Sequence, residues 1–177
     1  MTQQISSTAI VSFTMVALVV LQPTSAPLAS AANPEPFVIH ALPGLPGSTF
    51  SDAWGINNAG RIVGASATRG TAPHAVRWDG DSITDLGTLG GDSSFALDLN
   101  DRGDVVGYAD IGGGILHAAL WAHGTVTDLG TLGGSNSVAA AINNRGQVVG
   151  RSDVDTAGLS QCVSVGGGRD DRLGHAA

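Results

Sequence analysis

Repeated histidines and aspartates are the residues of this chain whose types and spacing could support catalysis or metal binding. His74 and His117 lie 43 residues apart, and Asp85 and Asp128 repeat the same interval. A histidine beside a carboxylate can transfer protons or bind a metal ion. A residue that returns in every unit of a repeat more often supports the framework, so we expect each histidine to form a hydrogen bond inside its own unit. His40 and His123 have no ligand spacing.

Each aspartate opens the same block, Asp-Leu-Gly-Thr-Leu-Gly-Gly, at residues 85–91 and 128–134. We expect these carboxylates to cap amide groups of the Gly-rich turn that follows. Calcium binding is the alternative, but Ca²⁺ takes several oxygen ligands and each block supplies one carboxylate. The glycines could also cradle a phosphate, yet no lysine follows them and no helix is expected after them. Tight turns explain them better.

Two further catalytic patterns lack residues or elements that they require. Asp79, Asp81 and Asp85 could form a pair of glycosidase carboxylates, but only Asp85 has a counterpart one unit later, and no Glu lies nearby to act as the acid. A serine nucleophile needs a strand, a sharp turn and a helix, and that context is missing. We therefore assign no catalytic, cofactor-binding or metal-binding residue and predict that the chain is not an enzyme.

The composition indicates the elements that must position these residues. The chain has 177 residues, 26 of them Gly, with a single Glu and no Lys. Glu and Lys normally cover helix surfaces, so we predict an all-β protein built from strands and tight turns. The net charge is −7 and the eight basic residues are scattered arginines. An acidic surface without clustered cations repels phosphate backbones, which argues against nucleic-acid binding.

The first 31 residues are predicted to be a signal peptide. An apolar run covers residues 9–21, two prolines follow it, and Ala29-Ser30-Ala31 supplies the small residues required for cleavage after Ala31. A membrane anchor is the alternative, but a spanning helix needs about 20 apolar residues. We expect a secreted protein with no stable membrane span after cleavage. Its single cysteine, Cys162, excludes an internal disulfide.

A 43-residue repeat organises the remaining chain. Asn57, Asn100 and Asn143 keep this interval, as do several glycines and the pair Trp78 and Trp121. Within the first unit we predict four strands, at residues 53–57, 61–66, 74–78 and 82–86. A hairpin turn at 58–60 and a variable loop at 67–73 separate them. Four short strands in about 40 to 45 residues are typical of a β-propeller blade.

The repeat domain is predicted to cover residues 32–152. It would contain complete units at 48–91 and 92–134 and a partial unit at 135–152. Residues 37–47 align with the end of a unit, so we predict a strand there that completes a blade. The result would be an incomplete propeller, an open fan of two to three blades. Its exposed sheet edges would permit self-association.

These units resemble the extracellular HAF repeat, a family of bacterial secreted repeat proteins. The resemblance rests on a His-Ala strand, at His74-Ala75-Val76 and His117-Ala118-Ala119, on Ile-Asn hairpins at residues 56–57 and 142–143, and on the blocks at Asp85 and Asp128. It covers residues 37–152, although the Phe of the family name is missing from both copies. It implies an exported, propeller-like protein without an established activity.

The repeat pattern stops after Ser152. A third unit should place His near residue 160 and Trp near residue 164, but Ser160 and Ser164 stand there. When residues 165–176 are read back into degenerate codons and shifted by one nucleotide, the permitted residues include Trp, four variable positions and Met-Thr-Asp-Leu-Gly-Thr-Leu. We therefore predict a frameshift between residues 153 and 165, and a disordered tail at 153–177.

Two functions remain open. The first is a non-catalytic secreted protein that has a purely structural role or binds a glycan or a protein. Binding would use the loops at 67–73 and 109–116, because specificity resides where otherwise constant units differ. The second is a truncated fragment of a propeller enzyme whose catalytic residues lie in missing blades.

Overall fold

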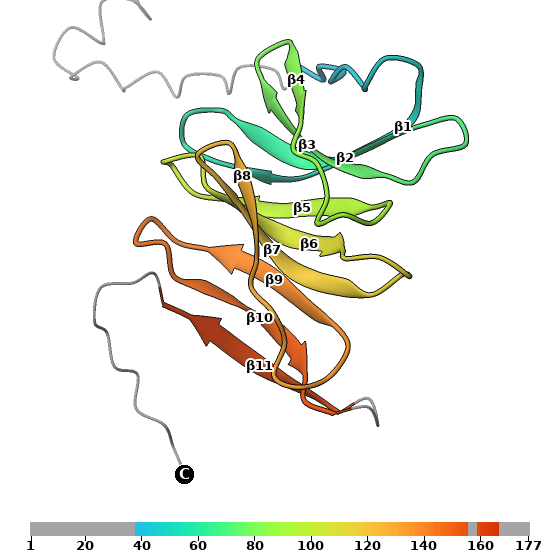
Figure 1. Cartoon of the computed structure of the whole chain (residues 1–177). Helices are drawn as coiled ribbons and strands as arrows, with labels where there is room; N and C mark the ends of the chain where they lie inside the picture. Colours follow the sequence, from blue (N-terminus) through green and yellow to red (C-terminus); the bar gives the residue numbers. More distant parts are fainter. Residues whose placement is uncertain (1–37, 156–158, 167–177) are drawn as a thin grey trace, which may run out of the picture. The chain divides into compact units, whose positions relative to one another are not determined.

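The computed structural model describes residues 38–155 and 159–166, and over these ranges it contains strands and no helix (Figure 1). The chain divides into two compact units, Met1–His40 and Ala41–Ala177. All strands lie in the second unit, where they form three antiparallel sheets. The all-β prediction is confirmed. The predicted signal peptide, residues 1–31, lies outside the described residues.

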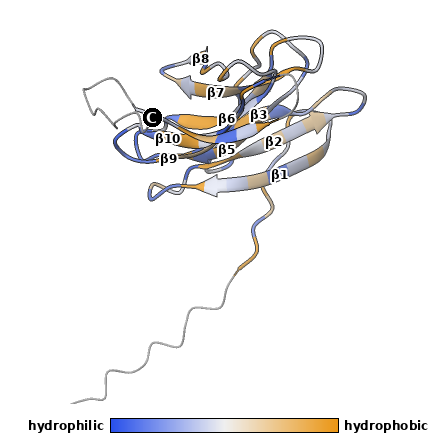
Figure 2. Cartoon of the chain, turned by 90° about the horizontal axis from the view of Figure 1, so that it is seen from below, coloured by the Kyte–Doolittle hydropathy of each residue, from blue (hydrophilic) through white to orange (hydrophobic). Residues whose placement is uncertain are grey.

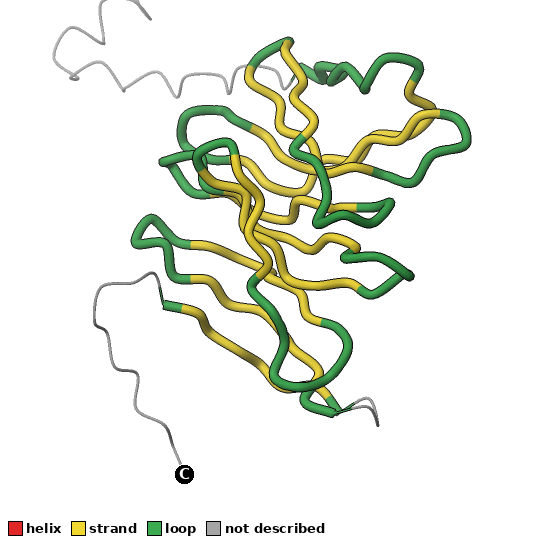
Figure 3. The backbone as a smooth tube through the Cα atoms, in the orientation of Figure 1, coloured by secondary structure: helices red, strands yellow, loops and turns green. Residues whose placement is uncertain are grey.

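The strands of each sheet pair in the order of the sequence, and loops and turns join them (Figure 3). The first sheet contains β1 (Ser48–Ile56), β2 (Ile62–Thr68), β3 (His74–Asp79) and β4 (Ser82–Asp85). The second contains β5 (Ser94–Leu99), β6 (Val105–Asp110), β7 (Leu116–Ala122) and β8 (Thr125–Asp128). The third contains β9 (Ser137–Ile142), β10 (Val148–Asp153) and β11 (Ser160–Val165). The predicted four-stranded unit is therefore observed twice, and β1 begins five residues earlier than expected.

The hairpin turns adopt the geometry predicted for them. Gly60 has a φ angle of 75°, and its N–H donates to the carbonyl oxygen of Asn57 at 3.0 Å. Gly103 and Gly146 repeat this conformation, with φ angles of 89° and 81°. A side chain would be strained in this left-handed region, which explains why glycine returns here in every unit.

A second set of repeated glycines has a different cause. A Cβ atom added at Gly107 would lie 1.9 Å from the carbonyl oxygen of Phe95, because β5 and β6 approach closely beside the register shift between Ala96 and Asp98. The same clash, with main-chain carbonyl oxygens, occurs at Gly64 and Gly150. Only glycine fits at this point of each sheet.

Hydrophobic side chains fill the two spaces between neighbouring sheets. The first cluster joins Val63 and Ala75 of the first sheet to residues of the second sheet, including Trp121. The second joins Val106 of β6 to Val148 of β10. Figure 2 shows that the hydrophilic turns gather at one end of the strands. The sheets are therefore held together by apolar packing between the middle sheet and each of its neighbours.

The strand predicted at residues 37–47 is not present in the described part of that range. Residues 38–44 form no strand, a turn occupies 45–47, and β1 begins at Ser48. Pro43 and Pro46 lack the N–H groups that a strand needs for pairing. The segment contacts the first sheet in another way, because the Pro43 carbonyl accepts a 2.6 Å hydrogen bond from Nε1 of Trp78.

The tail also differs from the prediction. Residues 160–165 were expected to be disordered, but they form β11, which pairs with β10 along its whole length. Strand pairing uses main-chain groups, so an edge strand forms without the side chains of the repeat. Residues 156–158 and 167–177 lie outside the described residues.

Candidate functional site

The two repeated histidines each pair with the aspartate of their own unit. Nδ1 of His74 lies 2.8 Å from Oδ2 of Asp85, and Nδ1 of His117 lies 2.8 Å from Oδ2 of Asp128. His74 is the first residue of β3 and His117 the second residue of β7, and each aspartate is the last residue of the neighbouring strand. The prediction of a hydrogen bond within the unit is confirmed.

The second oxygen of each aspartate caps the Gly-rich turn, as predicted. Oδ1 of Asp85 accepts the N–H of Gly87 at 2.8 Å, and Oδ1 of Asp128 accepts the N–H of Gly130 at 2.7 Å. Both glycines have positive φ angles. Over residues 38–155 and 159–166, no group of three or more His, Cys, Asp or Glu side chains is arranged to hold a metal ion.

The carboxylates considered for glycoside chemistry do not form a pair. Asp79 instead forms an ion pair with Arg61, with Nε and Oδ2 3.3 Å apart. Asp81 is exposed in the turn between β3 and β4. His123 lies in the matching turn between β7 and β8, with a φ angle of 54°, and His40 is exposed in the first unit.

A ladder of asparagines links the three sheets at the hairpin turns. Nδ2 of Asn57 donates to the carbonyl oxygen of Asn100 at 3.0 Å, and Nδ2 of Asn100 donates to the carbonyl oxygen of Asn143 at 3.3 Å. Asn100 is only 3% exposed. The repeated asparagine therefore connects units as well as closing its own turn, which is a role that the sequence analysis did not find.

A second ladder runs beside the first on the exposed side of these turns. Both carboxylate oxygens of Asp101 accept hydrogen bonds from Nδ2 of Asn58, at 3.1 and 2.9 Å, and Oδ2 also accepts one from Nδ2 of Asn144 at 2.8 Å. The hydrogen bonds from Asn58 and Asn144 hold the pKa of Asp101 below its ordinary value. Asp101 is thus the charged centre of the junction between three turns.

Two buried serines connect consecutive units by using both functions of the hydroxyl group. Oγ of Ser94 accepts the N–H of Ala75 at 2.8 Å and donates to the carbonyl of Gly87 at 2.7 Å. Ser137 repeats the arrangement with Ala118 one unit later. A hydroxyl group committed to main-chain partners on both sides is structural and not poised for nucleophilic attack.

Three aromatic rings form a stack that does not follow the repeat. Trp54 of β1 lies 5.7 Å from Phe95 of β5, measured between ring centroids, and Phe95 lies 4.9 Å from Tyr108 of β6. Trp54 is 44% exposed, and the other two rings are partly buried. Burial raises the pKa of the Tyr108 hydroxyl, and the positive charge of Arg151 opposes that shift. The equivalent residues one unit later are Leu97, Val138 and Arg151.

Sequence reasoning did not find this stack. Its members come from three strands of two sheets, so their distance along the chain gives no sign of contact. The signal available was that Trp54, Phe95 and Tyr108 are aromatic residues that break the repeat. Residues that break a repeat are free to serve a function that the framework does not need.

The variable loops are shorter than predicted. Residues 67–68 belong to β2, so the first loop covers 69–73, and residues 109–110 belong to β6, so the second covers 111–115. The second loop exposes Ile111 and Ile115 to 37% and 39%. The N–H of Gly112 donates to Oδ1 of Asp110 at 2.7 Å, which orders the start of this loop.

These features define an all-β repeat protein whose sheets are linked by polar ladders. Comparison with protein-family models, curated proteins and solved structures finds no match to this chain. Within the part of the chain that the structure describes, no helix has the length and apolar character needed to cross a bilayer.

Proposed function

We propose that this chain is a secreted, non-catalytic repeat protein that binds a glycan through its aromatic stack and the adjoining inter-strand loops. The observation that carries the proposal is the stack of Trp54, Phe95 and Tyr108. The repeated polar groups have internal partners, whereas Trp54 offers an open ring face.

An exposed aromatic ring suits a sugar for electrostatic and geometric reasons. The face of an aromatic ring carries partial negative charge, and the C–H groups on one side of a pyranose ring form a flat, weakly positive surface. The chain has a net charge of −7, so a neutral glycan meets less repulsion than a phosphate polymer does. A protein ligand held by the loops is the alternative occupant of this region.

The architecture proposed for the binding protein is an incomplete β-propeller of the HAF-repeat type. Two observations support this interpretation. The strands of each sheet pair in sequence order, and each new unit begins with a strand that packs on the preceding sheet, as β5 does on the first sheet. The segment at residues 43–47 imitates the end of a preceding unit, because Leu45 donates its N–H to Oγ of Ser66 as Leu132 does to Ser152.

A glycan array probed with the secreted protein tests the proposal. The Trp54→Ala variant should reduce the affinity for any bound glycan at least about tenfold, which corresponds to a loss of about 1.4 kcal/mol. Ile56→Ala is the matched control, since Ile56 is 67% exposed on the same strand but outside the stack, and it should leave binding unchanged. Binding that survives Trp54→Ala would contradict the role of the stack. Binding of a protein but no glycan would favour the alternative.

Secretion and self-association belong to the same proposal. N-terminal sequencing of exported protein should find a start at Ala32, and a start at Met1 would contradict the signal peptide. Within the described residues, β1 and β11 each pair along one edge only, so sheet edges are available for contact with other copies. Light scattering over a concentration series should show growth in mass, whereas a monomer with sharp, cooperative unfolding would argue against self-association.

A second candidate is a truncated fragment of a propeller enzyme. The register of β11 favours it, because Val165 pairs with Val148 as Trp121 pairs with Val105. Val165 is also the residue at which the shifted reading frame permits Trp. Sequencing the gene tests this directly. Codons that cannot encode the repeat in the shifted frame would end the frameshift hypothesis, and an in-frame gene with carboxylates unique to one blade would favour the enzyme.

A further inference from the structure

The tryptophan of the second unit fills a defined place between two sheets. Trp121 of β7 is 4% exposed and belongs to the cluster between the first and second sheets. It pairs in register with Val105 of β6. Leu86 and Leu89, from the connection between the sheets, pack against the same cluster. An indole ring is therefore the group that this repeat normally places here.

The third unit has the same place without the indole ring. Val148 of β10 corresponds to Val105, and its partner in register is Val165 of β11. Counting residues from Trp121 leads to Ser164, but the connection before β11 shifts the register by one residue, so Val165 stands at the position of the tryptophan. Val165 is 40% exposed, in contrast to the buried Trp121.

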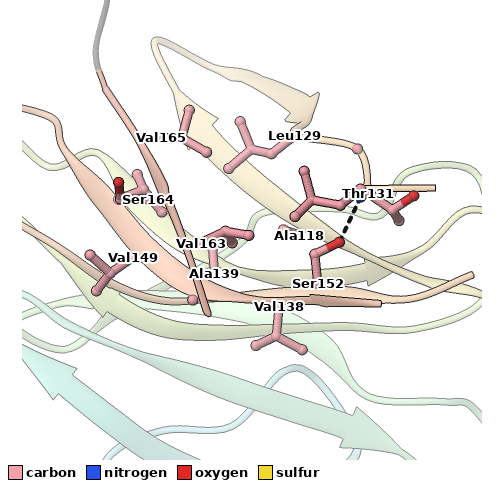
Figure 4. Close-up of a pocket in the computed structure, with 14 residues that line it drawn as sticks. Ala118, Leu129, Thr131, Val138, Ala139, Val149, Ser152, Val163, Ser164 and Val165 are labelled. Carbon is pink, nitrogen blue, oxygen red and sulfur yellow. Dashed lines mark hydrogen bonds between the residues drawn. The ribbon is translucent and has the colours of Figure 1, made fainter. Parts of the chain in front are cut away.

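A cavity occupies the space that the missing ring leaves (Figure 4). Its volume is about 200 Å³. The counterparts of the residues around Trp121 line it together with Val165. These are Leu129, Leu132 and Val148, each 43 residues after Leu86, Leu89 and Val105. Leu132 is 53% exposed, so its apolar surface lacks a cover.

We propose that this cavity binds a neutral, flat aromatic compound of the size of indole, in the place that the side chain of Trp121 fills in the preceding unit. An aliphatic cavity of about 150 Å³ binds benzene, so a cavity of about 200 Å³ has room for two fused rings. Covering Leu129, Leu132 and Val148 with such a ring removes apolar surface from water.

The polar requirements of the ligand are small. Nε1 of Trp121 is buried and has no hydrogen-bond partner among the described residues, so this environment accepts an indole N–H without a specific acceptor. A charged ring substituent buried in the cavity would lose its hydration without gaining a counter-charge. The ligand class is therefore defined by shape and apolar surface.

Thermal unfolding of the full chain with added indole tests the site. Indole should raise the midpoint of wild-type unfolding in proportion to the logarithm of its concentration once the site is saturated. Val165→Trp should fill the cavity and weaken indole binding at least tenfold. Cys162→Trp is the matched control, because Cys162 is exposed, lies on the opposite face of β11 from Val163 and Val165, and does not line the cavity, so this variant should keep the response.

Two results would overturn the proposal. One is the absence of any midpoint shift in the wild type up to the solubility limit of indole, and the other is an undiminished shift in folded Val165→Trp. If that variant does not fold, NMR of the wild type with indole decides the question. Perturbed methyl signals of Leu129 and Leu132 would support the site, whereas perturbation confined to Trp54 would refute it and leave the glycan proposal unaffected.

Discussion

The side-chain amide of Asn57 donates a 3.0 Å hydrogen bond to the main-chain carbonyl of Asn100, the same residue of the next unit. This contact crosses the boundary between two sheets, and Asn100 repeats it toward Asn143. A hydrogen bond that joins equivalent positions of consecutive units sets their register. The polar ladder and the apolar clusters thus stabilise the same interfaces between neighbouring sheets.

Replacing Asn100 by alanine should weaken the chain more than replacing its counterpart Asn143. Asn100 is buried, its Oδ1 accepts the N–H of Asp104, and its Nδ2 donates to the carboxylate of Asp104. Asn100→Ala leaves these groups unpaired and should lower the free energy of unfolding by about 2 kcal/mol. Asn143 is exposed, so water replaces its partners and the loss should stay near 0.5 kcal/mol, about the size of a surface substitution. Urea unfolding measures the free energy of unfolding of both variants. Equal losses would contradict the stabilising role assigned to the buried Asn100.

The buried Ser94 offers a second comparison within the repeat. Ser94→Ala removes the partner of two main-chain groups, the N–H of Ala75 and the carbonyl of Gly87, and should lower the free energy of unfolding by about 2 kcal/mol. Ser51 occupies the same repeat position but is exposed in the first unit, so Ser51→Ala should change stability by less than about 0.5 kcal/mol. Denaturant titration of the two variants would refute the assignment if Ser51→Ala were the more damaging.

The two buried tryptophans should respond differently to replacement by phenylalanine. Trp78 donates to the carbonyl of Pro43, whereas Nε1 of Trp121 has no partner among the described residues. Trp78→Phe therefore loses a hydrogen bond that Trp121→Phe does not, and it should reduce the free energy of unfolding by about 1 kcal/mol more. Unfolding curves followed by circular dichroism measure the difference. A larger loss for Trp121→Phe would show that packing, and not the hydrogen bond, dominates.

Acid should weaken the junction around Asp101. The pKa of Asp101 is lowered in the folded state by hydrogen bonds from Asn58 and Asn144, so its contribution to stability is complete above the ordinary carboxyl pKa of about 4 and is lost as the pH falls below that value. Asp101→Asn should therefore flatten the loss of stability between about pH 5 and pH 2.5.

Asp81→Asn is the matched control for the pH experiment. Asp81 is exposed in the turn between β3 and β4 and is not one of the residues bonded to Asp101, so Asp81→Asn removes the same charge without altering the junction. Asp153 has a pKa lowered by hydrogen bonds from Ser160 and Asn136, so part of the acid sensitivity should remain in Asp101→Asn. Identical pH profiles for wild type and Asp101→Asn, measured by thermal unfolding, would exclude a role for the junction.

Two predictions from the sequence were wrong for reasons that the structure makes clear. Residues 38–47 resemble in sequence a segment that forms a strand in the repeat. Pro43 and Pro46, however, lack the N–H groups that strand pairing requires. Residues 160–165 lack the residue types of the repeat. They nevertheless form β11, because the edge of β10 offers main-chain hydrogen-bond partners to an extended segment. Pairing depends on the backbone and on an available edge, and a pattern of residue types reports neither.

The sequence alone determined the all-β class, the 43-residue unit, the strands within it and the capping of the Gly-rich turns by Asp85 and Asp128. These features depend on local alternation, on glycine at left-handed positions and on residues that recur at one interval. The tertiary structure decided the ladder from Asn57 to Asn143, the stack of Trp54 on Phe95 and the cavity beside Val165. Those contacts join different sheets, so they exist only after the units have packed, and no local pattern encodes which side chains then meet.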